Sequence, residues 1–315
     1  MLLLYVLLLI LSLAVLVLSG HFMVRSLSRV ASILHISEFV AAFILMALST
    51  SLPELFVAIS SGLSGTTSLS LGDVIGSNIA NLTLVAGIGI VIAKGYTPET
   101  VSIKKDTRFM FLVSIIPLVL LLIGGTLSRL DGIILLVIFV VYARHLLKER
   151  QAFSKQSDEH STRWQTVRAP VVFLGALVVL FVSSYFTVKF ATTIAMASGI
   201  APIMIGLILI ALGTSLPELS FTINAFLNHK GDLSLGNLIG SVVANSTMVL
   251  GVAAILSPII ADPFILATAG IFMLLSTFLF LTFIERKDHI TTGEGLVLIT
   301  VYVGFIVTQV YLPTL

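Results

Sequence analysis

Apolar residues occur along the chain in runs long enough to cross a lipid bilayer as helices, with short polar stretches between them. A hydrocarbon core of about 30 Å requires about 20 apolar residues in a helix. The pattern predicts ten membrane-spanning helices, near residues 2–20, 30–62, 70–93, 108–126, 130–147, 169–188, 198–228, 234–260, 262–284 and 293–313. The second and seventh runs are too long for one plain span, and each contains a proline.

A single long hydrophilic stretch, residues 148–168, divides the ten runs into two groups of five. We therefore expect a first five-helix repeat at 1–147, a linker at 148–168 and a second five-helix repeat at 169–315. The predicted fold class is an all-α polytopic membrane protein.

Composition supports a lipid environment. The 315 residues are 57% hydrophobic and 10% charged, with a mean hydropathy of +1.15, whereas a soluble domain carries about 25% charged residues. The absence of cysteine excludes disulfides, thiol catalysis and zinc–thiolate sites. A net charge of +2 is too balanced to indicate a nucleic-acid partner. The first run lacks the basic start and cleavage site of a signal peptide, so we expect it to be retained as a span.

Basic residues are distributed unequally between the two sets of loops. When the loops are assigned alternately to two sides, 15 of the 17 basic residues fall on one side, and the other holds Arg129 and Lys189. Because basic loops remain in the cytoplasm, we expect the 148–168 linker inside and both termini outside the cell membrane.

The chain contains an internal repeat. Residues 49–88 align without gaps with residues 213–252, at an offset of 213 − 49 = 164, and 20 of the 40 positions are identical. The shared residues include Thr, Ser, Pro, Glu, Gly and Asn, which chance does not favour in membrane helices. Each copy has an odd number of spans, so the second must enter the membrane from the opposite side. Inverted repeats of this kind are typical of secondary transporters, whose substrates bind near the midplane at discontinuous helices.

The repeated motif Thr-Ser-Leu-Pro-Glu has the chemistry of a cation site. Pro53 and Pro217 lack an N–H and clash with the preceding turn, so each should break its helix and release backbone carbonyls. Glu54 and Glu218 follow at once, and a carboxylate within the membrane is by default functional. Further oxygen ligands are expected in the motif and, at a helical spacing of four, in the next span; they are Thr50, Ser51, Thr214, Ser215, Ser77, Asn81, Ser241 and Asn245. Hard oxygen ligands favour Ca²⁺, Na⁺ or Mg²⁺ over zinc or copper.

Other polar and small residues have simpler interpretations. Gly72 with Gly76, and Gly236 with Gly240, form small-xxx-small patterns that favour close helix packing. Four aspartates near the predicted span ends are expected to be solvated; they are Asp73, Asp131, Asp232 and Asp262.

The motif pair TSLPE…GSNIAN and GTSLPE…GSVVAN resembles the two alpha repeats of the cation/calcium exchanger superfamily, and most closely its compact prokaryotic and archaeal sodium/calcium exchangers. The resemblance covers the whole ten-span layout. It implies an antiporter that exchanges about three Na⁺ for one Ca²⁺, with the first and sixth spans sliding past the remaining helices to alternate access.

The resemblance also implies roles for individual residues. Glu54 and Glu218 would be the central carboxylates, and the carbonyls of Thr50 and Thr214 further calcium ligands. Flanking sodium sites would consist of Ala47, Ser51 and Ser77 in one repeat and Ala211, Ser215 and Ser241 in the other. Asn81 and Asn245 match the middle position. Asn245 departs from the Asp that many members carry there, which leaves a proton-driven calcium exchanger as an alternative.

Two other classes of function are weaker interpretations. A cation channel would dissipate gradients, whereas inverted repeats around one carboxylate pair suit a closed, alternating site. An intramembrane enzyme would need a nucleophile and a base, and no such pair is evident. We expect no enzymatic activity and no cofactor beyond the transported Ca²⁺ and Na⁺, and we expect the lipid bilayer, rather than nucleic acid or a protein, as the partner.

Overall fold

The computed structural model describes residues 2–33, 50–98, 101–151, 163–286 and 289–311. Within these ranges the regular structure is helical apart from two isolated β-bridges. The first half contains α1 (Leu2–Ile33), α3 (Leu52–Leu63), α4 (Thr67–Ala80), the π-helix η1 (Asn81–Val85), α5 (Ala86–Ile92), α6 (Val101–Gly124) and α7 (Arg129–Gln151). The second half contains α8 (Arg163–Ser198), α9 (Pro202–Ile205), η2 (Gly206–Ile210), α10 (Ala211–Thr214), α11 (Leu216–Leu227), α12 (Gly231–Ala244), η3 (Asn245–Val249), α13 (Leu250–Leu256), α14 (Pro263–Glu285) and α15 (Thr292–Tyr311).

The described helices of the first half have counterparts in the second half. The series α4–η1–α5 is matched by α12–η3–α13, and the two π-helices begin at Asn81 and Asn245, which are 245 − 81 = 164 positions apart. A π-helix inserts one extra residue into a turn and often marks a functional site. The repeat seen in the sequence is therefore also a repeat of local backbone geometry.

Two β-bridges connect the halves and obey the same symmetry. Tyr96, after α5, pairs with Ile290, before α15, through hydrogen bonds of 2.8 and 2.7 Å. Leu127, before α7, pairs with Ile259, after α13, through bonds of 2.9 and 3.0 Å. Ile259 follows Tyr96 by 259 − 96 = 163 positions, and Ile290 follows Leu127 by 290 − 127 = 163 positions. Both separations are within one residue of the repeat offset of 164, so the two bridges are counterparts of each other. Loops of one repeat are thus hydrogen-bonded through their backbones to loops of the other.

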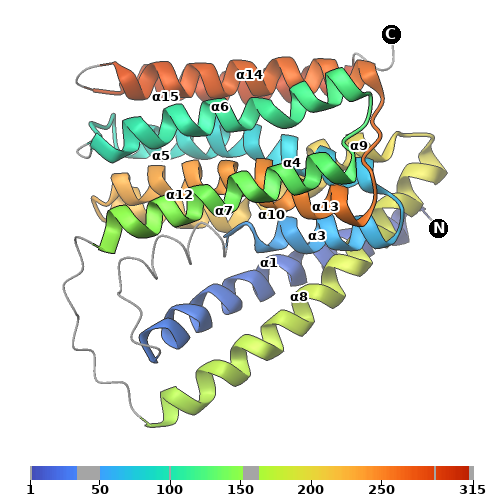
Figure 1. Ribbon diagram of the computed structural model, residues 1–315, viewed down its shortest axis with the longest axis horizontal. Coiled ribbons are helices and arrows are strands. Elements are labelled where there is room, and N and C mark those ends of the chain that lie inside the picture. The colour runs from blue at the N-terminus through green and yellow to red at the C-terminus, as the bar shows by residue number, and fades with distance from the viewer. Residues whose placement is uncertain (1, 34–49, 99–100, 152–162, 287–288, 312–315) are drawn as a thin grey trace.

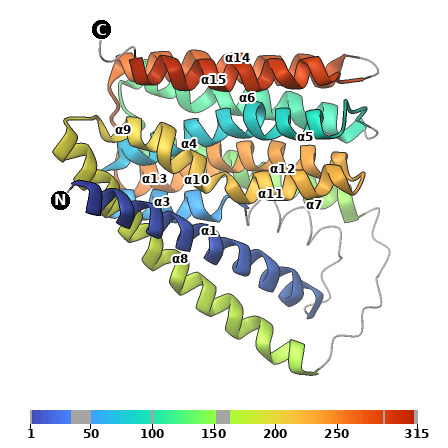
Figure 2. The same cartoon turned by 180° about the vertical axis from the view of Figure 1, so that it is seen from behind.

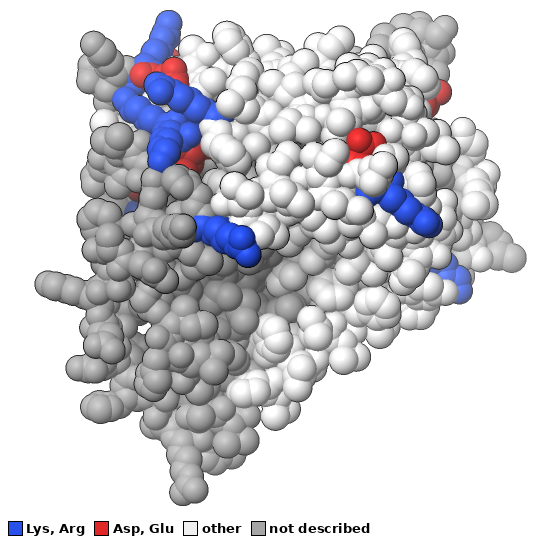
Figure 3. All heavy atoms as spheres, viewed as in Figure 1, with Lys and Arg blue, Asp and Glu red and all other residues white. Residues whose placement is uncertain are grey.

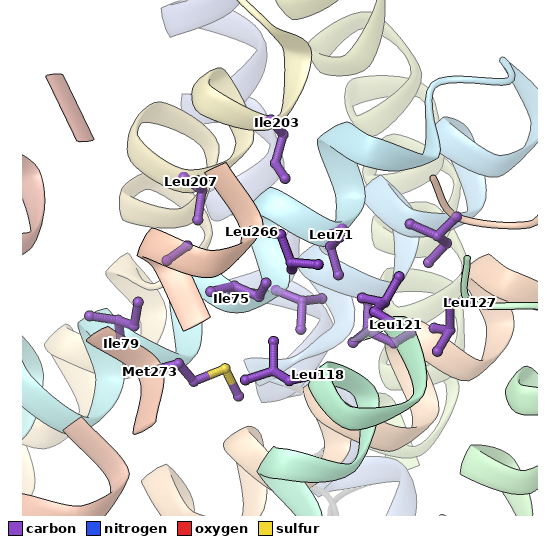
Figure 4. Close-up of a cluster of buried hydrophobic side chains, with 14 of the residues drawn as sticks. Leu71, Ile75, Ile79, Leu118, Leu121, Leu127, Ile203, Leu207, Leu266 and Met273 are labelled. Carbon is purple, nitrogen blue, oxygen red and sulfur yellow. The ribbon is translucent and has the colours of Figure 1, made fainter. Parts of the chain in front are cut away.

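The helices lie roughly parallel and antiparallel in one bundle (Figures 1 and 2). In both views α1 and α8 lie along one flank, whereas α14 and α15 lie along the opposite flank. Between the two flanks, α4, α6, α9, η2 and α14 pack on one another through a cluster of buried hydrophobic side chains (Figure 4). Its members include Leu71, Ile75, Leu118, Ile203, Leu207, Leu266 and Met273. The stretches Thr67–Ile92 and Gly231–Leu256, which contain α4 and α12, are the most buried of the membrane-length helices in the described chain.

Length and composition qualify eight helical stretches of the described chain to cross a membrane. The helix α7 is 23 residues long and lies in the same bundle, and α3 is a shorter apolar helix of 12 residues. Residues 34–49 of the predicted 30–62 run lie outside the described residues. The predicted all-α fold of two repeated halves is confirmed.

Lys and Arg gather at one end of the bundle on the face in Figure 3, beside the α5–α6 and α14–α15 connections. The N- and C-termini both lie at the other end (Figure 1). The end of α7 and the beginning of α8 lie at the basic end, so the loops rich in Lys and Arg and the two termini are at opposite ends of the bundle (Figures 1 and 3).

Helix bounds differ from the predicted runs where a helix continues beyond its apolar stretch. The helix α1 continues past Gly20 to Ile33, and α8 begins at Arg163 with Pro170 inside it, so neither residue ends its helix at the edge of the apolar run. The ends of the predicted 148–168 linker are helical as well, since α7 reaches Gln151.

Candidate cation-binding site

The second motif interrupts its helix as the sequence predicts. The helix α10 ends at Thr214 and α11 begins at Leu216, with Pro217 in its first turn. Pro217 has no N–H to donate to the carbonyl of Gly213, four residues earlier. In the first repeat, α3 likewise begins at Leu52 with a proline in its first turn, and the residues before Thr50 lie outside the described chain.

The two motif glutamates occupy the first turns of these broken helices. Glu54 in α3 and Glu218 in α11 both have no solvent-exposed surface. A helix N-terminus carries a partial positive charge that stabilises a carboxylate, so the break provides a place for the negative charge. The two carboxyl groups are close enough to interact electrostatically. Two inverted helix starts therefore direct two acidic groups into one buried region.

Hydroxyl groups in this region make contacts that cross between the repeats. The Ser77 hydroxyl of α4 lies 3.1 Å from the Thr214 hydroxyl and 3.4 Å from the Ala211 carbonyl oxygen. In the mirrored arrangement, the Ser241 hydroxyl of α12 lies 2.9 Å from the Thr50 hydroxyl. Ser241 also donates to Glu218 at 3.5 Å. Each motif is thus completed by a helix of the other repeat.

Many oxygens in the same region have no hydrogen-bond partner. They are fully buried and comprise the Ser51, Ser215 and Asn81 side-chain oxygens, both carboxylate oxygens of Glu54, one of Glu218, and the Asn245 amide oxygen. Buried polar atoms are nearly always satisfied, and each exception requires an explanation such as a bound ion or water. A cluster of unsatisfied oxygens around two carboxylates fits a cation.

The ligands available are mainly neutral oxygens. In the described part of the chain, no three His, Cys, Asp or Glu side chains are grouped closely enough to hold one metal ion. Any cation between Glu54 and Glu218 must therefore complete its coordination with hydroxyl, amide and backbone oxygens. This is the ligand set of a weakly held, hard cation such as calcium or sodium.

The structure brings eleven of the twelve predicted site residues into buried positions, in or beside the two motifs: Thr50, Ser51, Glu54, Ser77, Asn81, Ala211, Thr214, Ser215, Glu218, Ser241 and Asn245. Ala47 lies outside the described residues. The observed contacts place Ser77 beside Ala211 and Ser241 beside Thr50. This grouping crosses the repeats and differs from the within-repeat flanking sites that the resemblance implies. The ligand roles themselves stay a prediction.

The interpretation of Asp73 as a solvated residue was wrong. Asp73 has no exposed surface, and its Oδ1 accepts a 3.0 Å hydrogen bond from Thr214. Its counterpart Asn237 is equally interior and accepts from Thr50 at 3.4 Å. The signal was present in the repeat alignment, which pairs LSLGD with LSLGN. Asp131 and Asp262, by contrast, do cap helix starts near the surface.

Close backbone contact accounts for the burial of Asp73. A Cβ built on Gly72 would lie 2.2 Å from the Ile203 carbonyl oxygen, and one on Gly206 would lie 2.2 Å from the Leu69 carbonyl oxygen. The helices α4 and η2 therefore touch backbone to backbone, as the small-xxx-small pattern around Gly72 predicts. This contact carries α4, with Asp73 and Ser77, against the second motif.

Comparisons with known proteins agree with this architecture. A family model described as "Sodium/calcium exchanger protein" matches residues 4–148 and 168–311. The inner membrane protein YrbG of Escherichia coli is 31% identical over 310 residues, covering 95% of this chain and 94% of the relative. The putative antiporter CaxA of Alkalimonas amylolytica is 29% identical, covering 93% and 94%. The sodium/calcium exchanger MaX1 of Methanosarcina acetivorans is 28% identical, covering 97% and 98%.

Solved structures give the same result. The sodium-calcium exchanger NCX_Mj, soaked with 100 mM Na⁺ and 10 mM Sr²⁺, matches with a TM-score of 0.67 at 27% identity, covering 98% of this chain and 99% of that one. The same exchanger soaked with 2.5 mM Na⁺ and 0.1 mM Ca²⁺ matches with a TM-score of 0.68. Members of this family are multi-pass membrane transporters, not enzymes. The repeated motif, the paired helix breaks and these matches lead to one conclusion: the chain belongs to the sodium/calcium exchanger protein family.

Proposed function

We propose that this chain is a secondary antiporter that exchanges Na⁺ for Ca²⁺, about three Na⁺ for each Ca²⁺. The observation that carries the proposal is the cluster of buried, unsatisfied oxygens that the two inverted motifs form around Glu54 and Glu218. Calcium takes six to eight oxygen ligands and tolerates irregular geometry. The hydroxyl, amide and carboxylate oxygens here supply that chemistry.

Charge provides the basis for coupling. The carboxylates of Glu54 and Glu218 together carry two negative charges, which one calcium ion balances. Sodium ions that use the same carboxylates exclude calcium, because both cannot neutralise one pair of charges. Mutual exclusion at a shared site is the minimum requirement for exchange, and it makes the sodium gradient the driving force for calcium.

Movement of α1 and α8 is the proposed route to alternating access. These two helices pack on each other along one flank of the bundle (Figures 1 and 2), with Thr187 donating to Ser12 at 3.0 Å. Their contact with the remaining helices runs mainly through α3, with smaller contacts to α9, α10 and α11. Such a pair can slide as a unit while the bridged helices stay in place.

The proposed setting is the cell membrane, with both termini outside and the 148–168 linker in the cytoplasm. The support is the concentration of basic residues in the loops at one end, since basic loops stay on the cytoplasmic side.

A gradient experiment tests the proposal. Proteoliposomes loaded with sodium are diluted into sodium-free buffer that contains labelled calcium, and uptake is expected only while the sodium gradient exists. Collapsing that gradient with a sodium ionophore should abolish uptake. Uptake driven by a proton gradient alone would instead identify a proton/calcium exchanger. Asp131→Asn, in the first turn of α7 and away from both motifs, is the matched control and should transport normally.

A further inference from the structure

Asp73 and Asn237 occupy corresponding positions in the two repeats, since 237 − 73 = 164. Asp73 precedes Ser77 by four residues on α4, and Asn237 precedes Ser241 by four residues on α12. Both side chains are buried, at 0% and 2% exposure. Asp and Asn have nearly the same shape, so the two positions differ essentially in one negative charge.

In both repeats the buried side chain accepts a hydrogen bond from the motif threonine of the other repeat. Asp73 Oδ1 accepts from Thr214 at 3.0 Å and from Ser77 at 3.5 Å, and these two hydroxyls lie 3.1 Å apart. Asn237 Oδ1 accepts from the Thr50 hydroxyl at 3.4 Å, and Thr50 lies 2.9 Å from the Ser241 hydroxyl. Holding the motif threonine requires only an acceptor oxygen, and the neutral amide of Asn237 supplies one.

The charge of Asp73 therefore needs a separate reason. Burying a carboxylate is costly unless an opposite charge or several donors compensate it. The Oδ2 atom of Asp73 has no donor. The ion pairs that the described chain shows, Arg108 with Glu285 and Arg286 with Glu294, lie near helix ends at the basic edge of the bundle and do not include Asp73. The compensating charge must therefore come from a proton or from another small cation, and the atoms around Asp73 favour the latter.

The surroundings of Asp73 can hold a small cation. Four oxygens converge there, from the Asp73 carboxylate, the Ser77 and Thr214 hydroxyls, and the Ala211 carbonyl, which lies 3.4 Å from the Ser77 hydroxyl. One carboxylate with three neutral oxygens matches the charge of a monovalent hard cation. Asp73 does not join Glu54 and Glu218 in holding a single ion, because no three acidic side chains of the described chain are close enough to do so.

We propose that Asp73, with Ser77, Thr214 and the Ala211 carbonyl, forms a charged sodium site beside the Glu54–Glu218 pair, and that Asp73 makes this site bind sodium more strongly than its neutral counterpart at Asn237. The two flanking sites of an otherwise symmetric transporter are then unequal. This inference rests on the proposed function, because it assigns one of the sodium ions to a specific carboxylate.

Displacement of labelled calcium by sodium tests this assignment on the purified full chain in detergent. In Asp73→Asn, loss of one charge-assisted contact, worth about 1.4 kcal/mol, should raise the half-displacing sodium concentration about tenfold and lower the Hill coefficient. Calcium affinity in sodium-free buffer should change by a smaller factor, because calcium binds between the glutamates. Asp131→Asn should match the unmodified chain in both measurements.

The reciprocal variant Asn237→Asp provides an independent arm that does not depend on the folding of Asp73→Asn. It adds a carboxylate at the counterpart position and should lower the half-displacing sodium concentration. The proposal is overturned if sodium competition is unchanged in either folded variant, since Asp73 would then only orient Thr214. If the unmodified chain itself binds no calcium, or sodium does not displace it, the proposed function fails instead.

Discussion

The hydroxyl of Ser60 on α3 lies 2.8 Å from the hydroxyl of Ser184 on α8, with both side chains buried. This contact is a polar link between the α1–α8 pair and the motif helix of the first repeat. Phe56 and Phe181 pack edge to face on the same helices, with ring centroids 6.1 Å apart. The two hydroxyls are within hydrogen-bond distance in this relative position of α3 and α8. Sliding of α8 along α3 would separate them and break the bond.

Ser184→Ala should therefore shift the balance between access states. Hydrogen bonds between membrane helices are worth about 0.6 kcal/mol on average, which corresponds to a population change of about threefold. Because the chain has no cysteine, spin labels can be attached without background at Leu18→Cys on α1 and Val303→Cys on α15. The distance distribution between them reports the change.

Ser183→Ala is the matched control for that experiment. The Ser183 hydroxyl bonds to the Leu180 carbonyl within its own helix, so its removal should leave the distance distribution unaltered. Equal distributions for Ser184→Ala and the unmodified chain would mean that the Ser60–Ser184 contact does not bias access.

Glu54→Gln and Glu218→Gln should each abolish sodium-driven calcium uptake. The amide keeps the shape of the side chain but removes a charged ligand worth about 3 kcal/mol, which corresponds to at least about a hundredfold loss in the initial rate at limiting calcium. Glu285→Gln, at the end of α14, should leave the rate nearly unchanged. Ordinary uptake by either motif variant would contradict the placement of the site.

Gly206→Ala and Gly72→Ala should destabilise the folded protein. Each added methyl would enter a backbone contact at 2.2 Å, and overpacking of this kind costs about 1–3 kcal/mol. The measurement is the melting temperature in detergent. Gly175→Ala is the control, because nothing lies within 4 Å of a Cβ at that position; a comparable fall in this variant would show that the contact is not the cause.

Membrane potential should act on the calcium-loaded transporter. With charges on Asp73, Glu54 and Glu218, three sodium ions leave the site neutral, whereas one calcium ion leaves one negative charge. Calcium–calcium exchange in proteoliposomes free of sodium should accordingly depend on an imposed potential. Asp73→Asn should remove that dependence. A potential dependence that survives this substitution would contradict a charged Asp73.

The repeat and its chemistry could be predicted from the sequence because they depend on local features. Pro217 breaks a helix wherever it occurs, and Glu218 one residue later is unusual in any membrane segment. The position of Asp73 could not be predicted in this way. It lies near the start of an apolar run, where a carboxylate ordinarily reaches water, and it is buried only because Gly72 lets the second repeat approach.

Other differences have similar causes. The π-turns at Asn81 and Asn245 have no distinct sequence pattern, since tertiary packing selects the extra residue. The crossing of Ser77 to Ala211 and Thr214 depends on how the two halves dock, which neither half encodes alone. Sequence periodicity reports which face of a helix is polar, but not which helix will cover it.

The backbone contact between Gly72 and Ile203 also has a consequence for biosynthesis. Asp73 finds its hydrogen-bond donor Thr214 only after the ribosome has made well over half of the chain. Until then, the newly inserted N-terminal half holds buried acidic groups without their final neighbours. The N-terminal half therefore cannot complete its packing when it is first inserted. Its helices stay loosely packed, or in contact with the insertion machinery, until the C-terminal half is inserted and packs against them.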